Sequence, residues 1–353
     1  MEKITAYGYY FTGAGKPLEK QSLTIEECGE GEAVVKVAGC GLCHTDLGFI
    51  SGSVNTNHAL PLILGHEISG TVVAGGANCQ SLVGKKVIVP AVLPCGECEL
   101  CKGGRGNVCR KQVMPGNDFN GGFASYVKVP GRFLCQLPNE LGKFKLNQLA
   151  VVADAMTTPY QSLKKSKLKK GDLAIVIGVG GIGIYMVQLA KNVGATVIAM
   201  DIDDAKLERA KTQGADFTIN SKELSEKDLK NSIRGMVKEN KLPSHQWKVF
   251  EMSGTAAGQT TAFSLLSFAG TLGVVGFTME KVTLRLSNIM AFDADVFGNW
   301  GCLPEYYPEV ADKVLKGELN LLDNIEERPL DAINETLKEA FEHKLTKRVI
   351  FTP

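Results

Sequence analysis

The stretch Ala174-Ile-Val-Ile-Gly178-Val-Gly180-Gly181-Ile-Gly183 decides the fold of this 353-residue chain. It places the pattern G-x-G-x-x-G directly after an apolar run that predicts a strand and at the start of a predicted helix. The glycines permit a tight turn and let the backbone approach a pyrophosphate, which lies at the positive end of the helix dipole. Asp201 ends the next predicted strand, where a carboxylate accepts hydrogen bonds from a ribose 2′-hydroxyl. Because a carboxylate there repels a 2′-phosphate, the sequence favours NAD over NADP.

Strands and helices alternate on both sides of this stretch. The predicted strands are 173–178, 196–201, 217–220, 248–252 and 271–276, and the predicted helices are 182–193, 204–213 and 255–268. Gly194, Gly214 and Gly270 follow these helices as C-terminal stop signals. Such alternation implies a parallel sheet covered on both faces. We therefore expect an α/β chain with a Rossmann dinucleotide-binding domain over residues 156–296.

The rest of the chain has a different pattern. From about residue 25 to 135, short β-like runs at 32–38, 70–74 and 86–90 are separated by turn signals, which predicts a β-rich, barrel-like unit. The tail from about residue 297 carries a predicted helix near 331–343 and a last strand at 348–351. Segments 1–155 and 297–353 thus flank the Rossmann region.

Composition narrows the class of protein. Hydrophobic residues make up 44% and charged residues 22% of the chain, which excludes disordered, collagen-like and coiled-coil proteins. With 39 basic and 38 acidic residues the net charge is +1, so neither nucleic acid nor a membrane is an expected partner. The chain opens MEKITAYGYY without an apolar signal region, so we expect a cytoplasmic location.

Four cysteines form the first candidate metal site. The spacing Cys95-x2-Cys98-x2-Cys101-x7-Cys109 places four thiolates within fifteen residues, interleaved with glycines. Tetrahedral zinc takes four soft ligands, and a set of four leaves no open coordination position, so the predicted zinc is structural. The alternatives from spacing alone are free buried thiols or an iron–sulfur cluster.

The second cluster comprises Gly39-Cys40-Gly-Leu-Cys43-His44-Thr45-Asp46 and Gly65-His66-Glu67. A Cys, a His and a carboxylate together make an open zinc site with room for a substrate oxygen. From the residues alone, Cys40 and Cys43 are equally compatible with a redox pair, and His66 with a hydrogen-bonded core histidine.

Taken in this order, GLCHTD, GHE, the four-cysteine lobe and GVGGIG resemble the zinc-dependent medium-chain alcohol dehydrogenase family over essentially the whole chain. The resemblance implies a GroES-like catalytic domain, formed by segments 1–155 and 297–353 together, plus the Rossmann domain, with the active cleft between them. It also implies two zinc ions per subunit, NAD as cofactor and a homodimer or homotetramer.

The resemblance further implies roles for single residues. Cys43 and His66 bind catalytic zinc, Glu67 is a neighbouring or transient ligand, and Asp46 orients His66. Thr45 takes the substrate proton. The implied cofactor contacts are Gly178, Gly180, Gly181, Ile182, Gly183, Asp201, Lys206, Thr158 and Arg348. Cys28, Cys40, Cys79, Cys135 and Cys302 match no ligand position, and we expect them to be packing residues.

Two positions depart from the family pattern. The third catalytic zinc ligand, usually Cys, is Asp154 here; Cys⁻, neutral His and Asp⁻ still neutralise Zn²⁺. The histidine that ends the proton relay in some members falls on Gly48, which leaves His44 as the nearest candidate for the proton's exit. His44 is also a candidate contact for the cofactor pyrophosphate.

Longer stretches indicate a substrate. Residues 114–118, 152–160, 286–295 and 297–302 resemble 6-hydroxycyclohex-1-ene-1-carbonyl-CoA dehydrogenases of anaerobic benzoyl-CoA degradation. This resemblance implies NAD⁺-dependent oxidation of the ring hydroxyl of that acyl-CoA to 6-oxocyclohex-1-ene-1-carbonyl-CoA. The alternatives are a dehydrogenase of a free cyclic, aromatic or polyol alcohol and, more remotely, a non-catalytic cofactor-binding protein.

Overall fold

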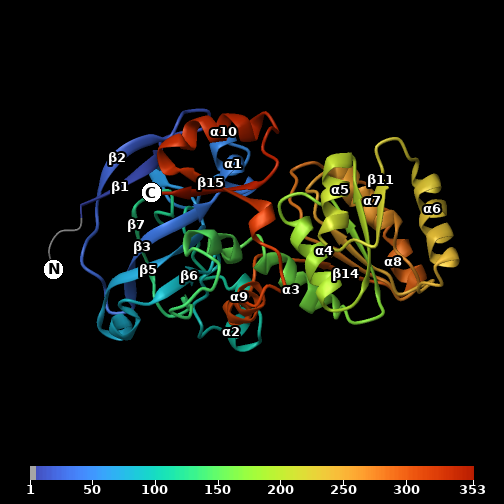
Figure 1. Ribbon diagram of the computed structural model, residues 1–353, viewed down its shortest axis with the longest axis horizontal. Coiled ribbons are helices and arrows are strands. Elements are labelled where there is room, and N and C mark those ends of the chain that lie inside the picture. The colour runs from blue at the N-terminus through green and yellow to red at the C-terminus, as the bar shows by residue number, and fades with distance from the viewer. Residues whose placement is uncertain (1–4) are drawn as a thin grey trace. The chain divides into compact units, whose positions relative to one another are not determined.

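The computed structural model describes residues 5–353, so residues 1–4, where the predicted catalytic domain starts, lie outside the described residues. The chain divides into two compact units (Figure 1). Unit 1 comprises the described part of Met1–Thr157 together with Gly301–Gly317 and Leu321–Pro353, and unit 2 comprises Thr158–Trp300 and Glu318–Asn320. Each unit has its own sheet and its own hydrophobic core.

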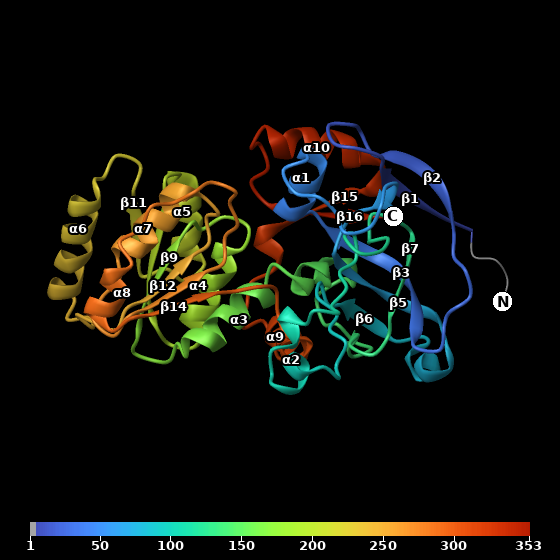
Figure 2. The ribbon, with the colours of Figure 1, turned by 180° about the vertical axis from the view of Figure 1, so that it is seen from behind.

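Unit 2 is built on a parallel sheet with the strand order β11-β10-β9-β12-β13-β14. Its strands are β9 (Leu173–Ile177), β10 (Thr196–Asp201), β11 (Phe217–Asn220), β12 (Lys248–Glu251), β13 (Thr271–Val274) and β14 (Asp295–Gly298). Its helices are α3 (Thr157–Ser166, whose first residue belongs to unit 1), α4 (Gly183–Asn192), α5 (Asp204–Thr212), α6 (Glu226–Glu239), α7 (Ala256–Ser264) and α8 (Ser287–Phe292). Helices flank the sheet on either side (Figures 1 and 2). This is the doubly wound arrangement in which dinucleotides bind where the strand order reverses, here between β9 and β12.

The five predicted strands of this unit and its three predicted helices are confirmed, with ends that differ by up to four residues. Helix α4 stops before Gly194 (φ 85°) and α5 before Gly214 (φ 115°), because a residue without a Cβ takes the left-handed conformation that ends a helix. The α7 helix ends at Ser264, four residues before the predicted end, and a turn over Phe263–Gly270 leads into β13.

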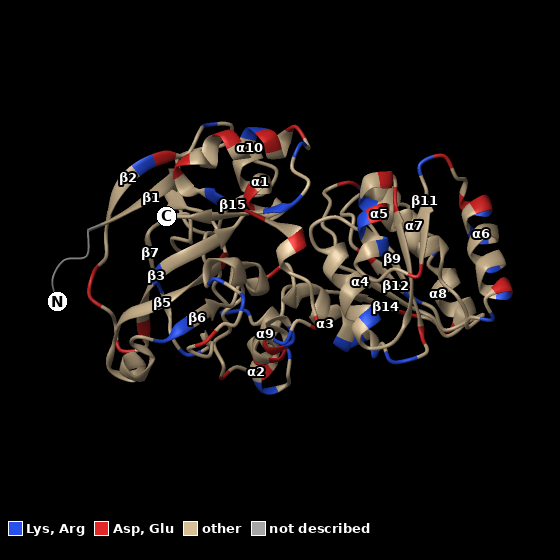
Figure 3. Ribbon diagram, viewed as in Figure 1, with Lys and Arg blue, Asp and Glu red and all other residues tan. Residues whose placement is uncertain are grey.

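Four elements of unit 2 were not predicted: α3, α6, α8 and β14. The pattern for α6 is present in the sequence, since Leu229, Ile233 and Val237 recur every four residues and are buried. Ser225 caps this helix by accepting a hydrogen bond from the Asp228 amide at 3.2 Å. Charged residues of both signs are spread along α6 (Figure 3).

Unit 1 is a β-rich unit with short helices. Its larger sheet has the order β15-β16-β3-β5-β6-β8 with β7 paired to β3, and a smaller sheet has the order β2-β1-β4. The strands are β1 (Thr5–Phe11), β2 (Glu19–Thr24), β3 (Glu32–Gly41), β4 (Leu62–Ile63), β5 (Glu67–Gly75), β6 (Lys86–Val89), β7 (Tyr126–Pro130), β8 (Cys135–Gln136), β15 (Ile325–Pro329) and β16 (Arg348–Thr352). The helices are α1 (His44–Ser51), α2 (Glu99–Lys102), α9 (Tyr307–Leu315) and α10 (Ile333–Phe341), with a 3-10 segment η3 (Asn147–Ala153).

Strands from the amino-terminal and carboxyl-terminal segments of the chain pair with each other in unit 1. Strand β16 pairs with β3 and β15, so the last strand, predicted at 348–351, is confirmed within a sheet that begins near residue 32. Helices α1 and α10 lie beside β15 (Figures 1 and 2) and contribute Phe49, Ile50, Ile333 and Leu337 to one core. The metal-binding motifs therefore lie in a unit that residues 301–353 help to build.

Candidate functional site

Cys43, His66, Glu67 and Asp154 come together in unit 1, each with a ligand atom within 4.8 Å of the others. Cys43 immediately precedes α1, His66 immediately precedes β5, and Asp154 follows η3. The Asp154 Oδ2 atom lies 3.7 Å from Cys43 Sγ and 3.7 Å from His66 Nε2. The structure thus brings together residues that are 111 positions apart in the sequence.

These separations fit a bound zinc ion. Donor atoms at 2.0–2.3 Å from a tetrahedral metal are separated from one another by about 3.3–3.8 Å. The donor set of one thiolate, one imidazole and one carboxylate is also one that zinc accepts. The predicted third ligand, Asp154, is therefore in a position to complete the set.

A buried carboxylate fixes two of the ligand-bearing segments. Asp46 is fully buried; its Oδ2 accepts a hydrogen bond from the Cys43 amide at 3.0 Å and its Oδ1 accepts one from the Gly65 amide at 3.1 Å. The predicted contact with His66 is longer, 3.6 Å from Asp46 Oδ1 to Nδ1, which is beyond a good hydrogen bond. Burial lowers the pKa of His66, but the negative charges of Asp46 and Cys43 outweigh it and leave that pKa well above its usual value.

Glu67 is held by an arginine from the far end of the chain. Arg348 Nε donates to Glu67 Oε2 at 2.7 Å and Arg348 Nη2 donates to Oε1, and both side chains are buried. Glu67 Oε1 also accepts a hydrogen bond from the Ala155 amide at 3.2 Å. Both carboxylate oxygens accept hydrogen bonds, and the buried guanidinium of Arg348 offsets the charge of Glu67. The predicted contact of Arg348 with the cofactor stays a prediction.

The two polar residues predicted to handle the proton open helix α1. Thr45 Oγ1 lies 3.8 Å from Cys43 Sγ, which puts a hydroxyl next to the metal-binding cluster. His44 is exposed at the start of the same helix. At Gly48 the space beside the backbone is occupied by Ser53, whose Oγ lies 3.6 Å from the position of an added Cβ.

The four predicted structural zinc ligands also meet. The Sγ atom of Cys98 lies 3.5 Å from that of Cys101 and 3.6 Å from that of Cys109, and Cys95 and Cys101 are 3.9 Å apart. Four sulfurs around one zinc are separated by about 3.8 Å, so the lobe fits the predicted ion. Backbone amides, that of Glu97 first, lower the pKa of Cys95 to about 6 and favour a thiolate there. Burial and the neighbouring thiols raise the pKa of Cys101 to about 12.

The remaining cysteines are all free thiols. Cys40, Cys79, Cys135 and Cys302 are buried and Cys28 is half-buried.

The residues predicted for the dinucleotide gather at the carboxyl ends of β9 and β10 in unit 2. Gly178 has φ 82°, and an added Cβ would lie 2.6 Å from Ser253 Cα, so only glycine fits this turn. Asp201 Oδ2 accepts a hydrogen bond from the Val179 amide at 2.9 Å. Lys206 Nζ lies 4.0 Å from the other oxygen of Asp201.

The other predicted cofactor residues are also placed. Gly180, Gly181 and Ile182 form the turn into α4, whose first residue is Gly183. Thr158 is buried on α3, and its carbonyl accepts a hydrogen bond from Asn299 Nδ2 at 3.1 Å.

Sequence reasoning did not identify two residues that hold the Asp154 segment in place. Tyr307, on α9, is fully buried; its hydroxyl donates to the Ala153 carbonyl at 2.6 Å and accepts from the Ala91 amide at 3.1 Å. Glu327, on β15, accepts hydrogen bonds from Asn147 Nδ2 at 2.6 Å and Gln148 Nε2 at 2.8 Å. No local motif marks either residue, because each partner lies more than 150 positions away.

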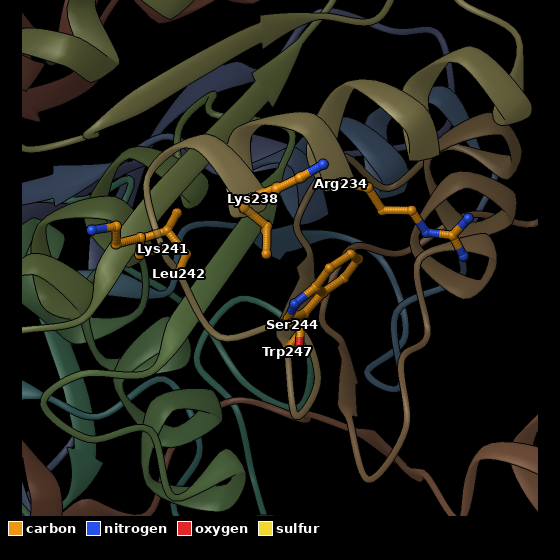
Figure 4. A pocket seen from close by; sticks show the side chains of 7 residues that line it. Arg234, Lys238, Lys241, Leu242, Ser244 and Trp247 are labelled. Carbon is orange, nitrogen blue, oxygen red and sulfur yellow. The ribbon is translucent and has the colours of Figure 1, made fainter.

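A separate pocket of 480 Å³ lies on unit 2, at the carboxyl end of α6 (Figure 4). It is lined by Arg234, Val237, Lys238, Lys241, Leu242, Ser244 and Trp247. The three cationic side chains extend away from one another (Figure 4), so they do not converge on a common anion. None of the residues predicted to bind metal or cofactor lines this pocket.

Within residues 5–353, no helix has the length and apolar composition needed to cross a membrane.

Comparison with known proteins places the chain in a family. Residues 29–139 match the alcohol dehydrogenase GroES-like domain, and residues 181–316 match the zinc-binding dehydrogenase family. An alcohol dehydrogenase of Geobacillus stearothermophilus is 31% identical over 338 residues, which cover 95% of each chain. The D-arabitol-phosphate dehydrogenase of Enterococcus avium is 30% identical over 337 residues, 93% of this chain and 92% of its own.

A solved structure agrees. The alcohol dehydrogenase of the hyperthermophilic archaeon Aeropyrum pernix has a TM-score of 0.87 and 26% identity, covering 98% of this chain and all of its own. The fold is thus the predicted combination of a GroES-like unit and a Rossmann unit. The chain belongs to the zinc-dependent medium-chain alcohol dehydrogenase family, whose members are oxidoreductases acting on CH–OH groups.

Proposed function

We propose that the chain is an NAD-dependent zinc alcohol dehydrogenase with one catalytic and one structural zinc per subunit. The observation that carries this proposal is the meeting of Cys43, His66 and Asp154 at separations of 3.7 Å. Four clustered cysteines support the structural ion. The carboxylate at Asp201 supports NAD, because it excludes a 2′-phosphate.

In the proposed reaction, the metal, the cofactor and single residues of the chain have separate roles. When bound, zinc supplies Lewis acidity to the substrate oxygen and NAD accepts the hydride. Thr45 Oγ1 lies 3.8 Å from Cys43 Sγ and would take the hydroxyl proton of the substrate while its own hydroxyl proton passes on toward solvent, for which the exposed His44 is the nearest candidate. Asp46 fixes the Cys43 and Gly65 segments, so the donor atoms keep their separation while charge develops on the substrate.

The charges of the metal and of its proposed ligands offset one another. Cys43 as thiolate and Asp154 as carboxylate offset the two charges of Zn²⁺, and Arg348 offsets Glu67. A carboxylate oxygen is a harder donor than the usual thiolate, which makes the bound metal a stronger Lewis acid and holds it less tightly.

The proposed substrate is 6-hydroxycyclohex-1-ene-1-carbonyl-CoA, on the resemblance of residues 114–118, 152–160 and 286–302. Its hydroxyl is allylic, so oxidation gives a conjugated enone, which favours hydride loss. Lysines at the end of α3 are a candidate contact for a CoA phosphate but add little support for a CoA site, since Lys165 Nζ donates to the Gly298 carbonyl and lies 4.8 Å from the Phe297 ring centre.

A second candidate is a free polyol or cyclic alcohol. It is favoured by the similarity to an alcohol dehydrogenase over nearly the full length of both chains, and the similarity to a D-arabitol-phosphate dehydrogenase adds phosphorylated polyols to the substrates to be tested.

The test is NADH absorbance after mixing zinc-loaded protein and NAD⁺ with the acyl-CoA, beside D-arabitol phosphate, sorbitol and cyclohexanol. Rapid NADH formation with the thioester alone supports the proposed substrate. Turnover of a free alcohol, without NADH formation from the thioester, supports the second candidate. NADH binding without turnover of any alcohol, in protein whose catalytic site takes up no zinc, indicates a non-catalytic cofactor-binding protein.

We also propose that the chain forms a homodimer or homotetramer through unit 2. Helix α8 has no buried residue, and its Met290 is 77% exposed; Leu286, just before it, is 68% exposed. Strand β14 is an edge of the described sheet. A second copy of the same edge covers this apolar surface and the unpaired backbone groups together.

A further inference from the structure

Glu251 lies at the carboxyl end of a central strand of unit 2. It ends β12, and its backbone lies in register with Ile177 of β9 and Val274 of β13. The strand order reverses between β9 and β12, and the carboxyl ends of these strands border the crevice where a dinucleotide binds. A fully buried carboxylate therefore lies at the edge of the proposed cofactor site.

Hydrogen bonds to Glu251 fix the positions of two loops. Its Oε1 atom accepts hydrogen bonds from the Ser253 amide at 2.8 Å, the Ser253 hydroxyl at 2.5 Å and the Gly254 amide at 3.2 Å. Its backbone carbonyl accepts from the amides of Val275 at 3.0 Å and Gly276 at 3.1 Å. The loops after β12 and after β13 are thus fixed to the same residue.

The loop after β12 supports the glycine turn. An added Cβ on Gly178, the first glycine of the fingerprint, would lie 2.6 Å from Ser253 Cα, so the turn rests directly on the segment that Glu251 holds. On its other side, Asp201 accepts the Val179 amide at 2.9 Å. The turn is therefore held between two carboxylates that end the strands on either side of β9.

The second oxygen of Glu251 argues for a role beyond stability. Oε2 is buried and has no hydrogen bond of normal geometry within the part of the chain that the structure describes. Burial raises the pKa of this carboxyl, although hydrogen bonds from Ser253 and from the amides of Gly254 and Gly276 oppose the rise. An incompletely satisfied buried carboxyl costs stability, which an apolar side chain would avoid.

We propose that Glu251 is a positioning residue for the cofactor: its carboxylate fixes residues 252–255 against the glycine turn and thereby sets the affinity of unit 2 for NAD. The inference rests on the proposed function, because it assumes that this turn binds a dinucleotide. A role in stability alone leaves the affinity of correctly folded protein for NADH unchanged, which separates the two roles.

The experiment is a fluorescence titration of zinc-loaded protein with NADH, using Glu251→Ala, Glu251→Gln and a matched control. The control is Asp216→Asn, since Asp216 also holds a strand in unit 2, accepting from the Val197 amide at 2.9 Å, but at the start of β10, away from the glycine turn. Loss of the bonds to residues 253 and 254 is expected to raise the Kd of Glu251→Ala about tenfold. Glu251→Gln keeps an acceptor oxygen, so its Kd is expected to rise about threefold.

A second readout is steady-state kinetics with saturating alcohol. KM for NAD⁺ is expected to follow the Kd, while kcat changes less than about threefold, because Glu251 touches no reacting atom. Asp216→Asn is expected to lower the melting temperature and leave both constants within about twofold.

Two results overturn the inference: NADH binding by Glu251→Ala as tight as in the wild type, or an equal loss in Asp216→Asn. If Glu251→Ala does not fold, Ser253→Ala removes the 2.5 Å bond to Glu251, together with the contacts of the same hydroxyl with Thr255, and keeps the carboxylate. Its Kd is expected to rise about threefold, and an unchanged Kd there also overturns the inference. Failure of the wild type to bind NADH overturns the proposed function itself, and the inference with it.

Discussion

At the scale of single residues, the most informative feature is the carboxylate at the third position of the proposed catalytic zinc site. Asp154 lies 3.7 Å from donor atoms of both Cys43 and His66. The residue before it is fixed by Tyr307, whose hydroxyl donates a hydrogen bond to the Ala153 carbonyl. The position of Asp154 is therefore determined by buried packing and not by the metal alone.

The first prediction concerns this ligand. Asp154→Ala is expected to lose the catalytic zinc, retain the four-cysteine zinc, and fall roughly a thousandfold or more in kcat/KM, because two ligands remain. Asp154→Cys restores the usual donor set and is expected to bind zinc more tightly than the wild type. Metal analysis by mass spectrometry after dialysis against a chelator measures both. Two zinc ions per chain and full activity in Asp154→Ala contradict the assignment.

The second prediction concerns the choice of cofactor. Asp201→Ser removes the charge that opposes a 2′-phosphate, so the ratio of kcat/KM for NADP⁺ to that for NAD⁺ is expected to rise at least about tenfold. KM for NAD⁺ is expected to rise as well, because Asp201 also holds the Val179 amide. Steady-state assays with both cofactors measure the ratio. In the control Asp203→Asn, a neighbouring cap of α5, the ratio is expected to stay constant; an unchanged ratio in Asp201→Ser counts against its role.

At the scale of elements, the ligand-bearing segment η3 is tied to strand β15. Glu327 accepts hydrogen bonds from Asn147 and Gln148 and lies 3.4 Å from Lys145 Nζ. Partial burial raises the pKa of Glu327, but the bonds from Asn147 and Gln148 and the charge of Lys145 outweigh it and lower that pKa below 4.5. The charged form is thus favoured in the folded chain.

The third prediction follows from the sign of that shift. A carboxyl whose folded pKa is depressed stabilises the fold above its unfolded pKa and loses this contribution as pH falls through the folded value. Glu327→Gln is expected to cost about 1 kcal/mol at pH 7, since the group is partly exposed. The difference in melting temperature from the wild type is expected to shrink between pH 5 and pH 3, followed by calorimetry or circular dichroism. A difference in melting temperature that is the same at pH 7 and pH 3 contradicts the proposed contribution of the Glu327 carboxylate.

Much of unit 2 could be predicted because its signals are local. A strand, a glycine turn and a helix follow one another within twenty residues, and Asp201 ends the next strand. The helix α6 was also predictable, from the Ser225 cap and the four-residue spacing of Leu229, Ile233 and Val237, although it was not predicted.

The contacts that fix the metal site could not be predicted from the sequence. Motifs identified Cys43 and His66, and family resemblance suggested Asp154. The partner of Glu67 is Arg348, 281 positions away, and the support for Ala153 is Tyr307, 154 positions away. Contacts of this range depend on how β16 and α9 pack, and no spacing in the sequence records that packing.

At the scale of the whole molecule, the exposed apolar side chains of unit 2 predict self-association. Placing glutamates at Leu286 and Met290 together adds two charges to a face that a second copy is proposed to cover. The double variant is expected to shift from a dimer or tetramer to a smaller species in light scattering coupled to size exclusion. Val83→Glu, at another exposed apolar position in unit 1, is the control and is expected to keep the wild-type mass. A monomeric wild type, or an unchanged mass in the double variant, contradicts the proposed interface.

The pairing of Glu67 with Arg348 has a consequence for biosynthesis. Translation delivers Cys43, His66 and Asp154 well before strand β16, which carries the arginine. Residues 158–300, by contrast, are contiguous and hold all six strands of their sheet. Because domains generally fold as units during synthesis, we expect unit 2 to complete its sheet before β16 is made. The charge of Glu67 beside the proposed metal ligands is then neutralised at a late step of folding.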